Sequence, residues 1–328
     1  MTEIMQVAFA SDNNYAQHMA VSIASLLVNA VQPGLLCINI LHDGLAEEHC
    51  NKITPLAALR PDTTIRFIRV SAHDLREYPL HTKLHPVAAY YRLKLPELLP
   101  EVTKVLYLDS DIIVKGDIAD LWVDDLGSLM LKAVEEPRSL NAERLTSFGM
   151  KAESPYFNSG VLSLNLALMR AEDFNTRAAQ LVGKYAPALR YQDQDVLNAL
   201  AEGRWAPLPL PYNSFFYVFI GIYQRDFMLY KEADIEQARR TPYIIHYNQH
   251  PKPWAEGCID PRRGEYFHYI DMTPYKGFRV NSFKSLWPAM LERCRAAAVA
   301  LSVGSPRLYL VLRSLKRGIK ACSLSRKP

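Results

Sequence analysis

The stretch VLYLDSDIIV, residues 105–114, places Asp109 and Asp111 directly after a run of apolar residues. Lys104–Leu108 has the composition of a buried strand, and Ile112–Val114 predicts a short strand that continues it. In open α/β sheets ligands bind outside the carboxyl ends of the strands, so a site is expected here. Alternate residues of an extended segment point the same way, so both carboxylates can face one cation.

The chemistry of this pair depends on what the rest of the chain supplies. Carboxylate oxygens suit Mg²⁺ or Mn²⁺, and an added histidine ligand favours Mn²⁺. Two aspartates that only cap a turn fit the tripeptide equally well. A strand ending in DxD is also typical of haloacid-dehalogenase-type phosphatases. Those enzymes usually carry Thr or Val where Ile113 stands, and their nucleophile strand normally lies near the N-terminus.

Strand and helix patterns alternate on the N-terminal side of the pair. Strands are predicted at Ile4–Ala10, Leu35–Leu41 and Thr64–Val70, and helices from Tyr15, at Leu45–Leu59 and at Tyr90–Leu99. Such alternation favours a parallel sheet with crossover helices, which places the chain in the α/β class.

The C-terminal side is less regular. Strands are predicted at Val161–Leu166 and Tyr243–Tyr247, and helices at Ala171–Tyr185 and Gln192–Ala201. Pro207–Tyr223 is rich in Pro, Phe and Tyr, which is more typical of an aromatic-lined loop than of a core element. No repeat or low-complexity linker interrupts residues 1–283, so one catalytic domain is expected there.

A basic segment, residues 284–328, follows this domain. It holds ten lysines and arginines against one acid, a charge of +9, whereas residues 1–283 carry −5. Leucines alternate with the bases, which predicts an amphipathic helix on an anionic membrane surface; a basic helix packed on the domain is the alternative. Nucleic acid is not an expected partner, because the positive charge is confined to this segment.

The N-terminus and the cysteines favour the cytoplasm. MTEIMQVAFASDNNY lacks the basic start and long apolar run of a signal peptide, and no apolar stretch is long enough to cross a bilayer. Five cysteines without a CxxC spacing argue against a disulfide framework or a zinc site. We therefore expect a cytoplasmic protein, held peripherally on the cytoplasmic face of the inner membrane by its basic segment.

Five other segments place polar residues beside predicted strands and helices. They are FASDNNY (9–15), YYRLKL (90–95), FNSGVLSLNL (157–166), YQDQDVLNAL (191–200) and HYNQHPKPW (246–254). The first has the short polar and aromatic residues that suit a nucleoside. The last ends a buried strand with His246 and then supplies Lys252 and Trp254.

Taken in order, these six segments resemble glycosyltransferase family 8, which includes bacterial lipopolysaccharide galactosyl- and glucosyltransferases and glycogenin. The resemblance covers about residues 4–256. It implies a GT-A fold, a Rossmann-like mixed sheet flanked by helices. It also implies UDP-glucose or UDP-galactose as donor, Mn²⁺ with Mg²⁺ as the alternative, and retention of anomeric configuration. The implied acceptor is a saccharide such as a lipopolysaccharide or lipooligosaccharide core, or another lipid-linked glycan.

The resemblance also implies roles for single residues. The implied metal ligands are Asp109, Asp111 and His246. The donor would contact Asp12, Asn14 and Tyr15 at the uridine, Asp109 and Ser110 beside the metal, Arg92 and Asn158 at the sugar, and Lys252 at the diphosphate. Asp193 and Gln194 are the implied catalytic residues, Asp193 on the sugar hydroxyls and Gln194 beneath the anomeric carbon. Gln249 stands where the family usually has glycine, and Glu136 is the best candidate for an acidic residue at the sugar.

Several of these residues also fit purely structural roles. His246 fits a satisfied core histidine, Arg92 a structural ion pair, and Asp12 a cap on the helix near Tyr15. Asp195 is expected to cap or pair on a helix surface, without a catalytic role. A non-catalytic binding module of the same fold is a third class of function, disfavoured because the predicted metal ligands are intact.

Overall fold

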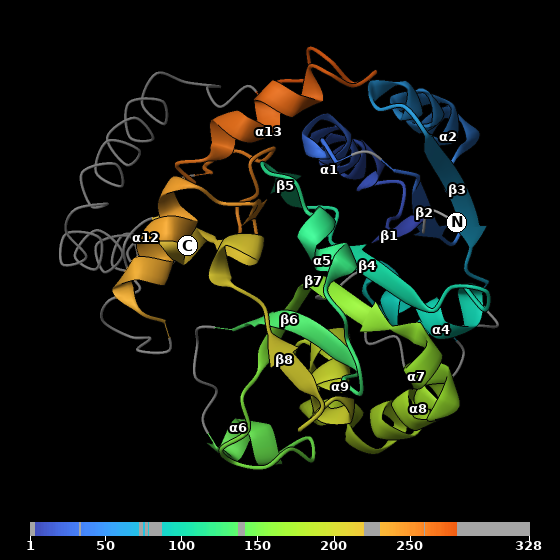
Figure 1. The fold of residues 1–328 in the computed structure, drawn as a ribbon, viewed down its shortest axis with the longest axis vertical. Helices are drawn as coiled ribbons and strands as arrows, with labels where there is room; N and C mark the ends of the chain where they lie inside the picture. The colour runs from blue at the N-terminus through green and yellow to red at the C-terminus, as the bar shows by residue number, and fades with distance from the viewer. Residues whose placement is uncertain are drawn as a thin grey trace, which may run out of the picture.

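The chain forms two β-sheets. The structure is a computed structural model, and it describes residues 4–32, 34–71, 75, 78, 87–136, 142–219, 230–258 and 260–280. The larger sheet has the order β3–β2–β1–β4–β7–β6–β8 and the smaller one β5–β10–β9 (Figure 1). Their bounds are β1 (Met5–Ala10), β2 (Leu36–His42), β3 (Thr63–Arg69), β4 (Lys104–Leu108), β5 (Ile112–Val114), β6 (Leu131–Glu135), β7 (Phe157–Asn165), β8 (Trp205–Pro207), β9 (Ser214–Phe215) and β10 (Ile244–His246).

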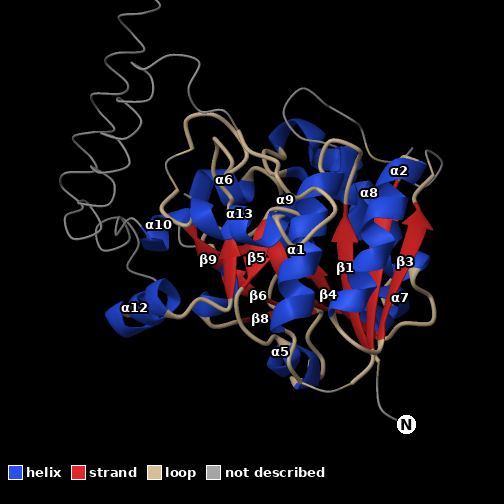
Figure 2. Ribbon diagram, turned by 90° about the horizontal axis from the view of Figure 1, so that it is seen from above, coloured by secondary structure: helices blue, strands red, loops and turns tan. Residues whose placement is uncertain are grey.

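The larger sheet is mixed. β1 to β4 run parallel, as the alternating pattern predicted, and the arrows of β1 and β3 point the same way in Figure 2. β7 runs antiparallel to both β4 and β6. The expectation of a parallel sheet is confirmed for β1 to β4, where strands and helices alternate, and the mixed GT-A sheet that the resemblance implied is confirmed as a whole. Beyond β4 the sheet also contains antiparallel pairs, although β8 runs parallel to β6.

Helices cover both faces of this sheet. The described helices, including 3₁₀ helices η1–η4, are α1 (Ala16–Asn29), α2 (Glu47–Ile53), η1 (Thr54–Leu59), η2 (Val87–Lys94), α4 (Leu95–Leu98), α5 (Ala119–Val123), α6 (Ala142–Thr146), α7 (Leu166–Ala171), α8 (Phe174–Tyr185), η3 (Ala186–Ala188), α9 (Gln192–Leu200), η4 (Leu210–Asn213), α10 (Phe216–Phe219), α12 (Glu232–Arg240) and α13 (Arg263–Ile270). Figure 1 shows α1 and α13 on one side of the sheet and α7 and α8 on the other. Val7 and Phe9 of β1 pack with α1, while the alternate residues Ala8 and Ala10 pack with the α8–α9 cluster.

Three predicted helices are divided in the structure. Leu45–Leu59 becomes α2 and η1, with Pro55 in the first turn of η1, since proline cannot continue the hydrogen bonding of α2. Tyr90–Leu99 becomes η2 and α4, with Pro96 near the junction. Ala171–Tyr185 begins in α7 and continues in α8 after Asp173, whose φ of 56° interrupts the helix.

The segment Pro207–Tyr223 is not the loop that its composition indicated. Its described part, residues 207–219, ends β8 and then forms η4, β9 and α10. Leu210, Phe215 and Phe216 are buried in the main core, and β9 pairs with β10. The aromatic residues of this segment therefore belong to the hydrophobic core. β6, which the sequence analysis did not predict, lies between β7 and β8.

The basic segment, residues 284–328, lies outside the described residues. The predictions of an amphipathic helix in this segment and of a domain limit at residue 283 also concern residues outside the described part. Within the described part of the chain, none of the helices combines the length and the apolar composition that spanning a bilayer requires.

Candidate active site

One cavity of about 440 Å³ lies where several chain segments meet. β1 and β4 end at it, and β7 and α9 begin at it. Its lining includes every donor, catalytic and metal residue that the resemblance implied except Asn14, namely Asp12, Tyr15, Arg92, Asp109, Ser110, Asp111, Asn158, Asp193, Gln194, His246 and Lys252. Glu136 and Gln249 line it too. The cavity is thus at the carboxyl edge of the parallel strands, where a ligand site was expected.

Strand pairing brings His246 to the aspartate pair. The chain leaves the large sheet at Asp109 and enters the small sheet at Ile112, which pairs antiparallel with His246 on β10. The Asp109 amide donates to the Gly160 carbonyl (2.9 Å), and the Ser110 hydroxyl donates to the Ala10 carbonyl (2.7 Å). The turn is therefore tied to both neighbouring strands, and its two carboxylates are held on the side of β10.

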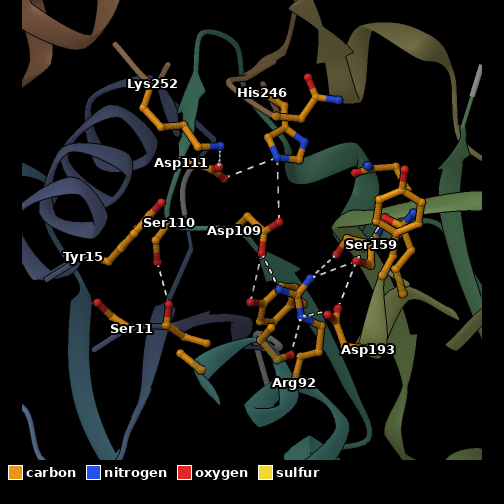
Figure 3. A pocket seen from close by; sticks show the side chains of 18 of the residues that line it. Ser11, Tyr15, Arg92, Asp109, Ser110, Asp111, Ser159, Asp193, His246 and Lys252 are labelled. Carbon is orange, nitrogen blue, oxygen red and sulfur yellow. Dashed lines mark hydrogen bonds and ion pairs between the residues drawn. The ribbon is translucent and has the colours of Figure 1, made fainter. Parts of the chain in front are cut away.

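The three predicted metal ligands form one cluster (Figure 3). Asp109, Asp111 and His246 each offer one ligand atom, and these atoms lie within 4.8 Å of one another. His246 Nε2 is 3.3 Å from Asp111 Oδ1 and 3.8 Å from Asp109 Oδ2. Two carboxylate oxygens and one imidazole nitrogen suit a divalent cation such as Mn²⁺. The donor set therefore fits a metal ion.

Asn213 orients the imidazole. Its Oδ1 lies 2.9 Å from His246 Nδ1, and its Nδ2 donates to Asn158 Oδ1 at 2.9 Å. Because the Asn213 oxygen can only accept, Nδ1 carries a proton in this contact, and Nε2 faces the two carboxylates. Metal-binding histidines commonly have such a partner on the second nitrogen. Asn213 is fully buried, so this orientation is shielded from water.

Two cations hold the outer oxygens of the aspartates. Arg92 donates to Asp109 Oδ1 (2.8 Å) and pairs with Asp193 (3.1 Å), and Lys252 lies 2.6 Å from Asp111 Oδ2. Burial would lower the pKa of Arg92, but Asp109 and Asp193 raise it above its ordinary value. Burial would raise the pKa of Asp111, but Lys252 and His246 hold it well below its ordinary value. The ion pair predicted as an alternative role for Arg92 exists, and it lies inside the cavity.

Ser159 contacts three other polar residues that line the cavity. Its amide donates to Gln194 Oε1 (3.0 Å), its hydroxyl donates to Asp193 Oδ2 (3.1 Å), and its carbonyl accepts from Arg92 (2.8 Å). Burial raises the pKa of Asp193 to about 6, although Arg92 opposes this. Asn158 Nδ2 donates to Glu136 at 3.2 Å, which places that acid beside the predicted sugar site.

Of the three residues predicted to contact uridine, Asp12 and Tyr15 line the cavity and Asn14 does not. Asp12 Oδ1 accepts from the Tyr15 amide (2.9 Å), so Asp12 holds the turn that leads into α1 instead of capping the helix, whose N-cap is Tyr15, and it also lines the cavity. Asn14 is exposed and lies outside the lining, and its contact with uridine stays a prediction. The Trp254 ring stacks on His18 at 3.7 Å and meets Tyr15 edge-on at 5.8 Å. Trp254 thus anchors the Lys252 loop to α1.

The sequence analysis missed three polar residues of this site. Asn213 lies in the segment that was predicted to be a loop. Ser159 and Tyr156 lie within two residues of Asn158, the residue of that stretch for which a role was predicted. Their partners are distant in the chain, so no local pattern indicated them. Asp195 does pair, as expected, but with Arg144 and Tyr156 in the interior instead of on a helix surface.

Comparison with known proteins agrees with this geometry. The family model described as glycosyl transferase family 8 matches residues 6–258. The chain belongs to glycosyltransferase family 8. Among related proteins, the chain is 28% identical over 292 residues to the lipopolysaccharide 1,2-glucosyltransferase of Escherichia coli K12, covering 87% of this chain and 83% of that one. It is 27% identical over 277 residues to general stress protein A of Bacillus subtilis, covering 83% and 95%.

The fold of this chain matches that of a galactosyltransferase of known structure. The galactosyltransferase LgtC, solved with donor and acceptor sugar analogs, superposes with a TM-score of 0.70 at 27% identity. The match covers 85% of this chain and 99% of LgtC. The GT-A fold of this family 8 chain is therefore confirmed.

Replacement of Asn213 tests the orientation of His246. In Asn213→Ala the imidazole loses the acceptor that holds its proton on Nδ1, so we expect Mn²⁺ affinity to fall about 10- to 100-fold. Asn213→Asp keeps the acceptor for Nδ1 but loses the donor to Asn158, so its affinity should fall less than that of Asn213→Ala. Mn²⁺ titration by calorimetry measures both. Equal affinity in wild type and Asn213→Ala would contradict the role of Asn213.

Proposed function

We propose that the protein is a retaining glycosyltransferase that moves glucose or galactose from UDP-hexose to a saccharide acceptor, with Mn²⁺ bound by Asp109, Asp111 and His246. The observation that carries this proposal is the convergence of these three ligand atoms in one cavity with Arg92, Asp193 and Gln194. The names of the lipopolysaccharide 1,2-glucosyltransferase and the galactosyltransferase LgtC support the two donor sugars. They also support a lipopolysaccharide or lipooligosaccharide core, or another lipid-linked glycan, as acceptor.

The charges of the cavity suit departure of a nucleoside diphosphate. A bound divalent cation stabilises negative charge on the leaving diphosphate. Lys252 lies beside Asp111, where it can move from the carboxylate to a phosphate oxygen. The Lys252 side chain is buried beside the ligand cluster, so its charge acts where little water screens it.

The residue types on the sugar side favour front-face attack. Retaining hydrolases use a carboxylate nucleophile, but Gln194 offers an amide, which is a poor nucleophile. Asp195 is fully buried and its oxygens accept from Arg144, Tyr191 and Tyr156. The acceptor hydroxyl therefore attacks from the side of the leaving phosphate, which takes its proton. Retention in the product, measured by NMR, is expected for this route and for double displacement alike, whereas a stable covalent adduct on Asp193 or Gln194 contradicts front-face attack.

A donor panel tests the reaction. UDP release is measured with UDP-glucose, UDP-galactose, UDP-N-acetylglucosamine and UDP-N-acetylgalactosamine, each with Mn²⁺, with Mg²⁺ and with a chelator. Release that depends on Mn²⁺ and favours one unsubstituted hexose supports the proposal. Hydrolysis of p-nitrophenyl phosphate without UDP release would support the phosphatase instead, and neither activity would support a binding module.

We also propose that residues 284–328 hold the enzyme on an anionic membrane surface at the cytoplasmic face, near a lipid-linked acceptor. The +9 charge of this segment supports the proposal. Full-length protein should sediment with anionic liposomes at low salt, whereas a 1–283 variant and neutral liposomes should give little binding. Equal sedimentation of the two proteins would exclude this role of the segment.

A further inference from the structure

A chain of polar contacts reaches Gln194 from outside the cavity. Arg144 Nη2 pairs with Asp195 Oδ2 at 2.5 Å, and the Tyr156 hydroxyl donates to Asp195 Oδ1 at 2.7 Å. Gln194 Nε2 then donates to the Tyr156 oxygen at 3.2 Å. At the other end of the same amide, Oε1 accepts from the Ser159 amide at 3.0 Å. Gln194 is thus held at both atoms of its amide group.

Each contact in this chain has one possible direction. A carboxylate in an ion pair only accepts, so Asp195, paired with Arg144, accepts the hydrogen bond that the Tyr156 hydroxyl donates. Burial and Asp195 raise the pKa of Tyr156 well above its ordinary value, so the hydroxyl keeps that proton. The Tyr156 oxygen is then left as an acceptor, which only the nitrogen of the Gln194 amide can satisfy. The Ser159 N–H, in turn, requires the amide oxygen.

The far end of the chain is firmly anchored. Asp195 is fully buried and also accepts from the Tyr191 amide at 2.8 Å. Arg144 donates to the Ala188 carbonyl at 3.0 Å and lies over the Phe148 ring at 4.5 Å. Tyr156 packs in the apolar cluster that includes Phe148. The position of the Tyr156 hydroxyl is therefore set by packing and by charge, independently of any bound sugar.

We infer that Tyr156 is a positioning residue that keeps the Gln194 amide in one orientation, an inference that rests on the proposed role of Gln194 beneath the anomeric carbon. An amide flip would set the NH₂ group against the Ser159 N–H and the carbonyl against the Tyr156 oxygen. Both contacts would then be repulsive. The donor sugar consequently meets the same amide dipole in every turnover, which is the preorganisation that stabilises charge in a transition state.

Loss of the hydroxyl should act on turnover more than on binding. In Tyr156→Phe the Ser159 N–H alone orients the amide, so we expect kcat to fall about tenfold or more while the donor KM changes less than about twofold. Tyr185→Phe removes a hydroxyl from the same apolar cluster and is the matched control, with kcat expected to stay at the wild-type value. Thermal unfolding of both variants checks that they are folded.

A double variant separates positioning from a general loss of structure. If Tyr156 acts through Gln194, adding Tyr156→Phe to Gln194→Ala should lower kcat by less than about twofold more. Losses that multiply in the double variant, or a wild-type kcat in Tyr156→Phe, overturn the inference.

An NMR measurement tests the orientation without catalysis. The side-chain NH₂ signals of Gln194, identified by their absence in Gln194→Ala, should be protected from hydrogen exchange in wild type and lose protection in Tyr156→Phe. Unchanged protection overturns the inference. A wild-type protein that releases no UDP would overturn the proposed function instead, and the exchange result would still decide the role of Tyr156.

Discussion

His246→Ala is expected to abolish metal-dependent UDP release, with kcat/KM at least about 10²- to 10³-fold lower at limiting Mn²⁺. The substitution removes the one nitrogen donor of the cluster and leaves two carboxylates that still have Arg92 and Lys252 as partners. The fold should therefore survive, because no buried cation loses its counter-ion. Thermal unfolding and Mn²⁺ calorimetry measure the two effects separately.

The aspartates need a different substitution from the histidine. Asp111→Ala removes the carboxylate that pairs with Lys252, and Asp109→Ala removes one of the two carboxylates that pair with Arg92. Breaking a buried ion pair costs about 3–5 kcal/mol of stability. Asp109→Asn and Asp111→Asn keep the shape and an oxygen for Arg92 or Lys252, so they isolate the loss of metal binding. Full activity of His246→Ala at limiting Mn²⁺ would show that the three-ligand assignment is wrong.

Local pattern was enough to predict the elements that carry this site. β1, β4 and β5 each have an apolar run that ends in polar residues, and His246 ends such a run on β10. The resemblance to family 8 then predicted that these strand ends share one ion. Their convergence depends on the pairing of Ile112 with His246, a contact between distant segments that periodicity does not encode.

The rest depended on tertiary packing. The aromatic composition of residues 207–219 favours a loop when read locally, yet those rings fill the core and carry Asn213 to His246. Tyr156 and Ser159 acquire their roles only because α9 begins beside β7. Polar residues that orient other side chains have no spacing of their own, so they were the part of the site that escaped prediction.

Gly160 lies in close contact with two of the proposed metal ligands. A Cβ atom built on it would lie 2.3 Å from His246 Cε1, 2.8 Å from His246 Nδ1 and 2.9 Å from Asp109 Oδ2. The backbone there cannot retreat easily, because the Gly160 carbonyl accepts from the Asp109 amide within the β4–β7 pairing. The glycine is thus required by space, since its φ lies in a region that alanine also adopts.

Gly160→Ala should therefore damage the metal site through one added methyl group. His246 or Asp109 must move to make room, so we expect Mn²⁺-dependent UDP release to fall at least about 100-fold, since displacements of about 1 Å can have that effect. Overpacking should also cost about 1–3 kcal/mol of stability. Gly183→Ala, exposed within α8 with no atom near its added Cβ, is the matched control and should be neutral or slightly stabilising. Mn²⁺ affinity by calorimetry and the rate of UDP release are measured in both variants. Wild-type values in Gly160→Ala would contradict the prediction that the added methyl group displaces His246 or Asp109.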